Sequence, residues 1–111
     1  MSTPFRVVFV DPSLKADLEK LEKGTFEEQR LAGWIRKAID RLVIDSKYGV
    51  KVPSSLWPKV YIQEYKITNL WKIDLPHGWH MMYTIRKHEL DLLGVILEWL
   101  DHARYERRHH Y

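Results

Sequence analysis

The stretch that decides the fold is TFEEQRLAGWIRKAIDRLVI, residues 25–44. Thr25 and Glu28 match the capping box, in which a hydroxyl and a Glu three positions later each accept a hydrogen bond from the other's backbone amide. Apolar residues then recur with a 3.6-residue rhythm, at Leu31, Trp34, Ile35, Ala38, Ile39, Leu42 and Val43. This pattern predicts an amphipathic helix that begins near Thr25 and buries one face.

A strand and a shorter helix are predicted before this stretch. Residues 5–10 are rich in β-branched and aromatic residues, which is typical of a strand. Asp11 suits the N-cap of a helix and Pro12 suits its first turn. Leucines follow at helical spacing: Leu14, Leu18 and Leu21. Gly24 is a plausible C-terminal stop, so we expect two antiparallel helices joined by a short turn.

After residue 60 the apolar period changes from helical to two, which predicts strands. Residues 46–59 contain glycines, prolines and serines, so we expect a loop there. The predicted strands are Val60–Lys66, Leu70–Leu75, Trp79–Arg86 and Leu92–Leu100. The last of these is almost continuously apolar, which indicates a central strand covered on both faces. Residues 101–111 read as a polar, basic tail.

These elements predict one α+β domain over residues 1–111. Its order is an N-terminal strand, a two-helix antiparallel hairpin, and a four-stranded, mostly antiparallel meander. We expect the helices to pack on one face of the sheet and the other face to be free for function.

Composition excludes several classes of protein. The chain has 111 residues, of which 45% are hydrophobic and 30% are charged, and this is typical of a globular domain. Cysteine is absent, which excludes disulfides, thiolate zinc sites and cysteine nucleophiles. No apolar run approaches the roughly 20 residues of a membrane span, and no signal-peptide pattern begins the chain. We therefore expect a cytoplasmic protein that has no membrane partner.

Motifs for phosphate loops and metal centres are missing. The glycines are scattered, so there is no glycine-rich phosphate loop. His77 and His80 have no third ligand at a suitable spacing. We expect no metal and no cofactor.

The residues that suit a catalytic site lie in the last third of the chain, which holds all the histidines. Alternation places His80 and Arg86 on one face of a strand, and Lys72 lies on the neighbouring strand. The tail adds His102, Arg104, Tyr105, Arg107 and Arg108. If their polar faces coincide, these residues line one groove.

Such a groove suits RNA cleavage by attack of a 2′-hydroxyl on its own phosphate. Histidine can act as general acid or base near neutral pH, and tyrosine can do so less readily. Lysine and arginine can stabilise the charge that develops on the phosphoryl oxygens without a metal. A plainer interpretation stays open, in which Lys72 and Arg86 pair with Asp74 or Glu89, and Arg107 and Arg108 belong to a solvated tail.

The same segments resemble a known family. The motifs are LWKIDL at residues 70–75, GWHMMYTI at 78–85 and ILEWLDHARY at 96–105. Together with the order strand, helix, helix, meander, they resemble the RelE/ParE superfamily of toxins from type II toxin–antitoxin modules. The resemblance covers residues 5–105.

The resemblance implies a ribosome-dependent endoribonuclease that cuts mRNA in the A site. A cognate antitoxin would hold it inactive in a toxin–antitoxin hetero-oligomer. Lys72 matches a basic residue that contacts the RNA phosphate, and His80 stands where the family most often has a catalytic Arg. Arg104 and Tyr105 fall near the family's C-terminal Arg and Tyr, and His102 begins its His-x-x-Tyr ending.

Two alternatives to this assignment stay open. The chain also ends in His110-Tyr111, which matches members with a catalytic His-Tyr terminus, so the position of the catalytic tyrosine is not fixed. The protein could also be a ParE-like inhibitor of DNA gyrase, or a catalytically degenerate toxin homologue that acts only by binding. The histidine- and arginine-rich C-terminal third favours the nuclease, because a gyrase binder needs no titratable groups around a groove.

Overall fold

The computed structural model describes residues 5–109 as an α+β fold with a five-stranded mixed sheet. Its strands are β1 (Phe5–Phe9), β2 (Val50–Lys51), β3 (Trp71–Asp74), β4 (His80–His88) and β5 (Asp91–Leu100). They lie in the order β1-β5-β4-β3-β2. β1 runs parallel to β5, and every other neighbouring pair is antiparallel. Three of the four predicted meander strands are therefore present, as β3, β4 and β5, and the N-terminal strand lies beside the last of them.

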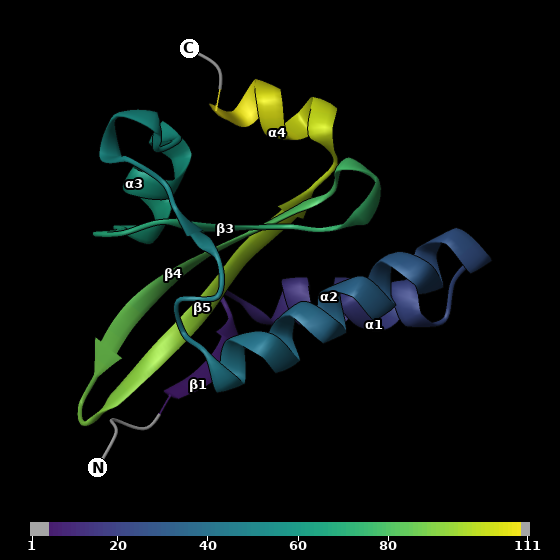
Figure 1. The fold of residues 1–111 in the computed structure, drawn as a ribbon, viewed down its shortest axis with the longest axis horizontal. Helices are drawn as coiled ribbons and strands as arrows, with labels where there is room; N and C mark the ends of the chain where they lie inside the picture. Colours follow the sequence, from purple (N-terminus) through teal and green to yellow (C-terminus); the bar gives the residue numbers. More distant parts are fainter. Residues whose placement is uncertain (1–4, 110–111) are drawn as a thin grey trace.

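Helices cover both faces of this sheet (Figure 1). The helices are α1 (Pro12–Glu22), α2 (Phe26–Ile44), α3 (Lys59–Tyr65) and α4 (His102–His109), with short 3₁₀ turns η1 (Ser54–Leu56) and η2 (Pro76–Gly78). α1 and α2 pack on what we call the first face, whereas α3 and α4 pack on the second face. None of these helices, within residues 5–109, is both long and apolar enough to cross a membrane.

The helix boundaries of α1 and α2 follow the predicted capping signals. Asp11 caps α1 by accepting a hydrogen bond from the Leu14 amide at 2.9 Å. Both halves of the Thr25–Glu28 capping box are formed at the start of α2. Arg36 of α2 donates two hydrogen bonds, of 2.9 and 3.0 Å, to the carboxylate of Glu22 in α1. The hairpin is therefore set by local chemistry that the sequence shows directly.

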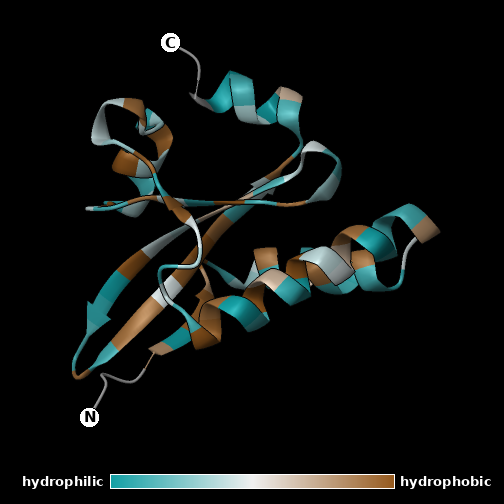
Figure 2. Ribbon diagram, viewed as in Figure 1, coloured by the Kyte–Doolittle hydropathy of each residue, from teal (hydrophilic) through white to brown (hydrophobic). Residues whose placement is uncertain are grey.

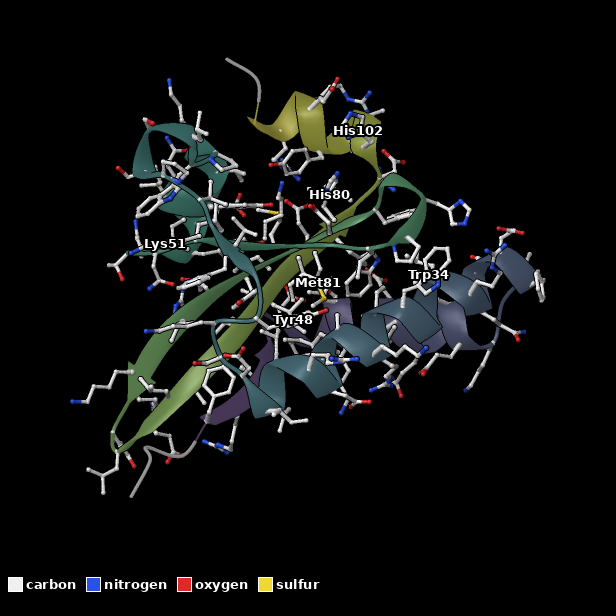
Figure 3. All side chains as sticks on the ribbon, viewed as in Figure 1. Trp34, Tyr48, Lys51, His80, Met81 and His102 are labelled. Carbon is white, nitrogen blue, oxygen red and sulfur yellow. The ribbon has the colours of Figure 1, made fainter. Side chains whose placement is uncertain are left out.

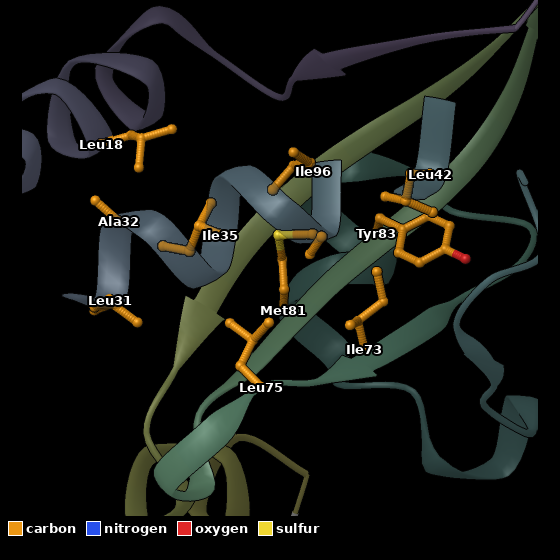
Figure 4. Packing of buried hydrophobic residues seen from close by; sticks show 11 residues of the cluster. Leu18, Leu31, Ala32, Ile35, Leu42, Ile73, Leu75, Met81, Tyr83 and Ile96 are labelled. Carbon is orange, nitrogen blue, oxygen red and sulfur yellow. The ribbon is translucent and has the colours of Figure 1, made fainter. Parts of the chain in front are cut away.

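The first face carries an apolar core between α1, α2 and the sheet (Figure 4). Leu18 of α1, Ile35 and Leu42 of α2, and Met81 of β4 are all fully buried. The predicted apolar side of the strand at 79–86 packs here. β5 lies between β1 and β4 and is buried on both faces, which confirms its expected central place.

The prediction of a strand at Val60–Lys66 is wrong. Residues 60–65 belong to α3, and the residue that caps its C-terminal end, Lys66, has a φ of 53°. Tyr61 of this helix is almost completely buried against the second face. The edge of the meander is supplied by β2 instead, which pairs with β3.

The prediction that helices cover only one face is also wrong. Met82 and Thr84 lie between His80 and Arg86 on the strand face that we expected to be open, and both are fully buried beneath the second layer. The tail is not a solvated extension, because most of it forms α4. Figure 2 shows α4 as mostly hydrophilic, in contrast to the largely hydrophobic β5 beneath it. This helix has only eight residues and very few of them are apolar, which is why the tail reads as unstructured.

A β-bulge adjusts the second face near its C-terminal end. Met82 pairs with Glu98 and Tyr83 pairs with Ile96, which leaves Leu97 as an extra residue in β5. The bulge shifts the alternation, so that Glu98 joins Leu97 on the second face. There the Glu98 carboxylate accepts hydrogen bonds from Tyr61 of α3 and Arg108 of α4. The bulge thus creates the anchor point for both covering helices.

Candidate functional site

A pair of histidines lies where α4 crosses the end of the sheet (Figure 3). His80 is the first residue of β4 and His102 is the first residue of α4. His80 Nε2 and His102 Nδ1 are 3.4 Å apart, which is within hydrogen-bonding reach. Met81, next to His80 in sequence, points to the opposite face and packs in the first core, as strand alternation requires.

Asp74 contacts His80 at the ring nitrogen that does not face His102. It lies opposite His80 in the β3–β4 ladder, and its Oδ1 is 2.8 Å from His80 Nδ1. The Lys72 ammonium lies 3.4 Å from the same oxygen. Partial burial raises the pKa of Asp74, but the hydrogen bond with His80 and the charge of Lys72 outweigh it and lower that pKa overall. Asp74 is therefore a carboxylate at neutral pH, and it fixes one ring nitrogen of His80.

Tyr105 of α4 packs over His80. The two ring centroids are 4.2 Å apart, and the Lys72 ammonium lies 5.3 Å from the centre of the tyrosine ring. Because of this packing the His80 side chain is only 11% exposed, whereas the His102 side chain is 62% exposed. A substrate on this surface would therefore meet His102 before His80.

The start of α4 fixes the orientation of His102. Asp101 accepts a hydrogen bond from the Arg104 amide at 2.9 Å, and this bond lowers the pKa of the Asp101 carboxyl. One turn into the helix, Glu106 Oε1 lies 2.9 Å from His102 Nε2. His102 is thus held between a buried imidazole on one side and a carboxylate on the other.

Arginines of α4 line a neighbouring pocket. This pocket of about 270 Å³ is bordered by Glu98, Leu100, Arg104, Arg107 and Arg108. Arg108 makes a bidentate pair with Glu98, with both hydrogen bonds at 3.0 Å. Arg104 lies 3.4 Å from the Asp101 carboxylate. Within the described residues Arg107 forms no ion pair, so its charge is available to an anion.

One predicted RNA-binding residue lies elsewhere. Arg86 is six residues from His80 along β4, which corresponds to about 20 Å of extended strand. Its guanidinium donates a hydrogen bond to the Tyr65 carbonyl at the C-terminal end of α3. Arg86 therefore stabilises a helix terminus and does not join the histidine pair.

The structure brings Lys72, His80, His102 and Tyr105 together, and it places Arg104 and Arg107 on the same helix as two of them. Arg108 serves first as an anchor of α4. The alternative terminus His110-Tyr111 lies outside the described residues. His77, which the sequence analysis considered with His80 as a metal ligand, stacks instead on Trp34 of α2, with ring centroids 5.2 Å apart. Among residues 5–109, no group of three or more histidines and carboxylates could hold a metal ion.

Two residues of the site were missed from the sequence. The sequence predicts Asp74 only as a partner of Lys72; that ion pair is present, and Asp74 also contacts His80. Glu106 is not among the residues that the sequence singles out. The spacing of His102 and Glu106, four residues apart, would have revealed their contact if the tail had been recognised as a helix.

Comparisons with known proteins yield no relative. No family model, no curated protein and no solved structure matches the chain.

Proposed function

We propose that the protein is a RelE-like toxin, a metal-independent endoribonuclease that cuts mRNA on the ribosome. The observation that carries this proposal is the meeting of Lys72, His80, His102 and Tyr105 on one surface beneath and along α4. The arginine pocket borders the same helix. Imidazoles for proton transfer and cations for phosphate are the groups that this chemistry needs.

In the proposed reaction the 2′-oxygen of the RNA attacks the adjacent phosphorus. The bond from phosphorus to the 5′-oxygen breaks, which gives a 2′,3′-cyclic phosphate and a free 5′-hydroxyl. Water takes the proton of the 2′-hydroxyl, and His102 gives a proton to the departing 5′-oxygen. Lys72 and Arg107 stabilise the charge on the phosphoryl oxygens. His80 stays behind His102 as its proton partner, and Tyr105 holds His80 in place.

The chain's architecture is compatible with this family. A strand and a helical hairpin precede the antiparallel strands, as the resemblance implies in outline, whereas α3 replaces the first of the four expected meander strands. As a toxin the protein would act in the cytoplasm with ribosomes and mRNA as partners. A free nuclease would arrest its own cell, so we propose that a cognate antitoxin neutralises it in a hetero-oligomer.

The test is inducible expression combined with mapping of mRNA ends on translating ribosomes. We expect growth arrest and cleavage by the natural chain. His102→Ala should lower cleavage by about 10²–10⁴-fold, the usual contribution of a general acid. His88→Ala is the matched control, since His88 is an exposed histidine at the far end of β4 and should leave cleavage unchanged.

Other results would contradict the proposal in distinct ways. Arrest with intact mRNA and an induced DNA-damage response would indicate a ParE-like gyrase inhibitor. Absence of any arrest would indicate a degenerate homologue that only binds.

A further inference from the structure

The outer nitrogens of the histidine pair are both committed to carboxylates. His80 Nδ1 is 2.8 Å from Asp74 Oδ1, and His102 Nε2 is 2.9 Å from Glu106 Oε1. An ionised carboxylate can only accept hydrogen bonds. Each outer nitrogen therefore carries a hydrogen, and this fixes the tautomer of each ring.

The inner nitrogens, His80 Nε2 and His102 Nδ1, then cannot form a hydrogen bond with each other while both rings are neutral. In a neutral imidazole one nitrogen is a donor and the other is an acceptor. With both outer nitrogens protonated, His80 Nε2 and His102 Nδ1 would present two lone pairs to each other across 3.4 Å. Only one further proton between them turns this repulsion into a hydrogen bond.

We infer that Asp74 and Glu106 are positioning residues that make His80 and His102 hold one shared proton. The pair then has three ring protons on four nitrogens and a charge of about +1. One carboxylate lies at each end of the chain of contacts, and the Lys72 ammonium lies 3.4 Å from the Asp74 oxygen that contacts His80. The other groups that face the pair are Lys72 from β3 and Tyr105 from α4.

The shared proton deepens the proposed function, on which its catalytic part rests. Glu106 is exposed at the surface, so an incoming 5′-oxygen can displace it from His102 Nε2. His102 then gives its Nε2 proton to that oxygen, while the shared proton moves fully onto His102 Nδ1. His80 is left neutral with its proton on Nδ1, held by Asp74. The pair as a whole loses one proton, and solvent restores it.

Ring-nitrogen NMR of the free protein, labelled at histidine, tests the protonation state without any RNA. At the pH of the cleavage assay we expect hydrogens on His80 Nδ1 and His102 Nε2, and one proton shared by the inner nitrogens. On raising the pH this proton should leave in a single step that both rings report. Two independent steps, or a neutral pair with only two ring protons, would overturn the inference.

Substitution of Asp74 or Glu106 provides a second test of the shared proton. Asp74→Ala lets His80 move its proton to Nε2 and donate to His102 as a neutral ring, so the third proton should be lost. Glu106→Ala should have the same effect from the other side. Both side chains are mostly exposed, so thermal unfolding should change little. Glu64→Ala, at an exposed position of α3, is the matched control and should leave the ring protons unchanged.

Cleavage assays separate this inference from the proposed function. Asp74→Ala should lower cleavage at least about tenfold and move its pH profile to lower pH, whereas loss of His102 itself should cost about 10²–10⁴-fold. Three ring protons without cleavage under any condition would overturn the nuclease and leave the proton-sharing intact. Cleavage by a pair with two ring protons would overturn the shared proton and leave the nuclease intact.

Discussion

The two faces of the sheet are built on different principles. The first face is covered by α1 and α2, whose apolar stripes fill a core of aliphatic and aromatic side chains. The second face is covered by two short helices, and buried polar groups lie among its apolar residues. There the Thr84 hydroxyl donates to oxygens of Asn69, and the Glu98 carboxylate accepts hydrogen bonds from Tyr61 and Arg108. We expect the first face to supply most of the stability, and the second face carries the candidate chemistry.

This contrast explains how a helix with very few apolar residues stays attached. α4 has little apolar surface, so directed polar contacts fix its position: the Asp101 cap, the Arg108–Glu98 pair and the histidine pair. Directed contacts hold side chains in one geometry, which is what proton transfer needs. They also make α4 easier to detach than α2. The following experiments test that division from the largest expected effect to the smallest.

Truncation of the first core should have the largest effect on stability. Ile35→Ala removes a fully buried side chain of α2 and should lower the free energy of unfolding by about 2–5 kcal/mol. Ile62→Ala, at an isoleucine of α3 that is 43% exposed, is the matched control and should cost far less. Urea unfolding measures both. Equal losses would mean that the two helical layers contribute alike.

Removal of the α4 anchor should have a smaller and more local effect. Arg108→Ala leaves Glu98, which is 19% exposed, without its bidentate partner. Because Arg108 is itself 40% exposed, solvent screens the pair, and we expect a loss of about 1–2 kcal/mol. Hydrogen exchange should accelerate in α4 before it does in α2. Arg107→Ala should change neither quantity, and a similar response there would show that general charge holds α4.

The capping box of α2 should contribute about 1 kcal/mol. Thr25→Ala removes the hydroxyl that accepts from the Glu28 amide, and such losses cost about 0.5–2 kcal/mol. Thr25→Ser keeps the oxygen and should restore most of the stability. Thermal unfolding checks the pair of variants. An unchanged melting temperature for Thr25→Ala would show that packing alone sets the start of α2.

Acid should weaken both faces slightly. The hydrogen bond from Arg36 lowers the pKa of Glu22 on the first face, and contacts with His80 and Lys72 lower that of Asp74 on the second. In each case the unfolded chain binds the proton more readily than the folded chain does. This stability is therefore present at neutral pH and is lost as the pH falls through the lowered values. Both carboxylates are partly exposed, so the effect is the smallest of the four.

Comparison of Glu22→Gln with Asp74→Asn assigns the acid sensitivity to the two faces. Each variant should flatten its own part of the curve of unfolding free energy against pH below the usual carboxyl range. A curve that keeps its full slope in both variants would show that other carboxylates dominate.

The sequence predicted the first face well because its signals are local. The Asp11 and Thr25 caps, the apolar rhythm of α2 and the hairpin between α1 and α2 each depend on residues within a few positions of one another. The apolar run of β5 likewise revealed a strand buried on both sides. The error at 60–66 arose because seven residues with mixed character fit a strand and a short helix equally well.

The sequence predicted four residues of the candidate site, and it did not predict which of them are in contact. The residue types of Lys72, His80, His102 and Tyr105 pointed to one region of chemistry. Which of them touch depends on the β3–β4 register and on the path of α4, neither of which is encoded by spacing alone. Arg86 shows the same limit, since it shares the predicted strand with His80 and lies about 20 Å away along it.

By itself, the sequence determined the helices and strands that are stabilised by contacts between residues close together in the chain. It also determined that histidines and basic residues are concentrated in the last third. Only the tertiary structure decided that a bulge turns Glu98 toward α4, that α4 covers the second face, and that Asp74 and Glu106 hold the two ends of a histidine pair. The physical reason is the distance along the chain between the residues that interact. Caps and periodicity act over one or two helical turns, whereas a shared proton depends on four side chains from three elements that meet only when the sheet and its last helix have packed.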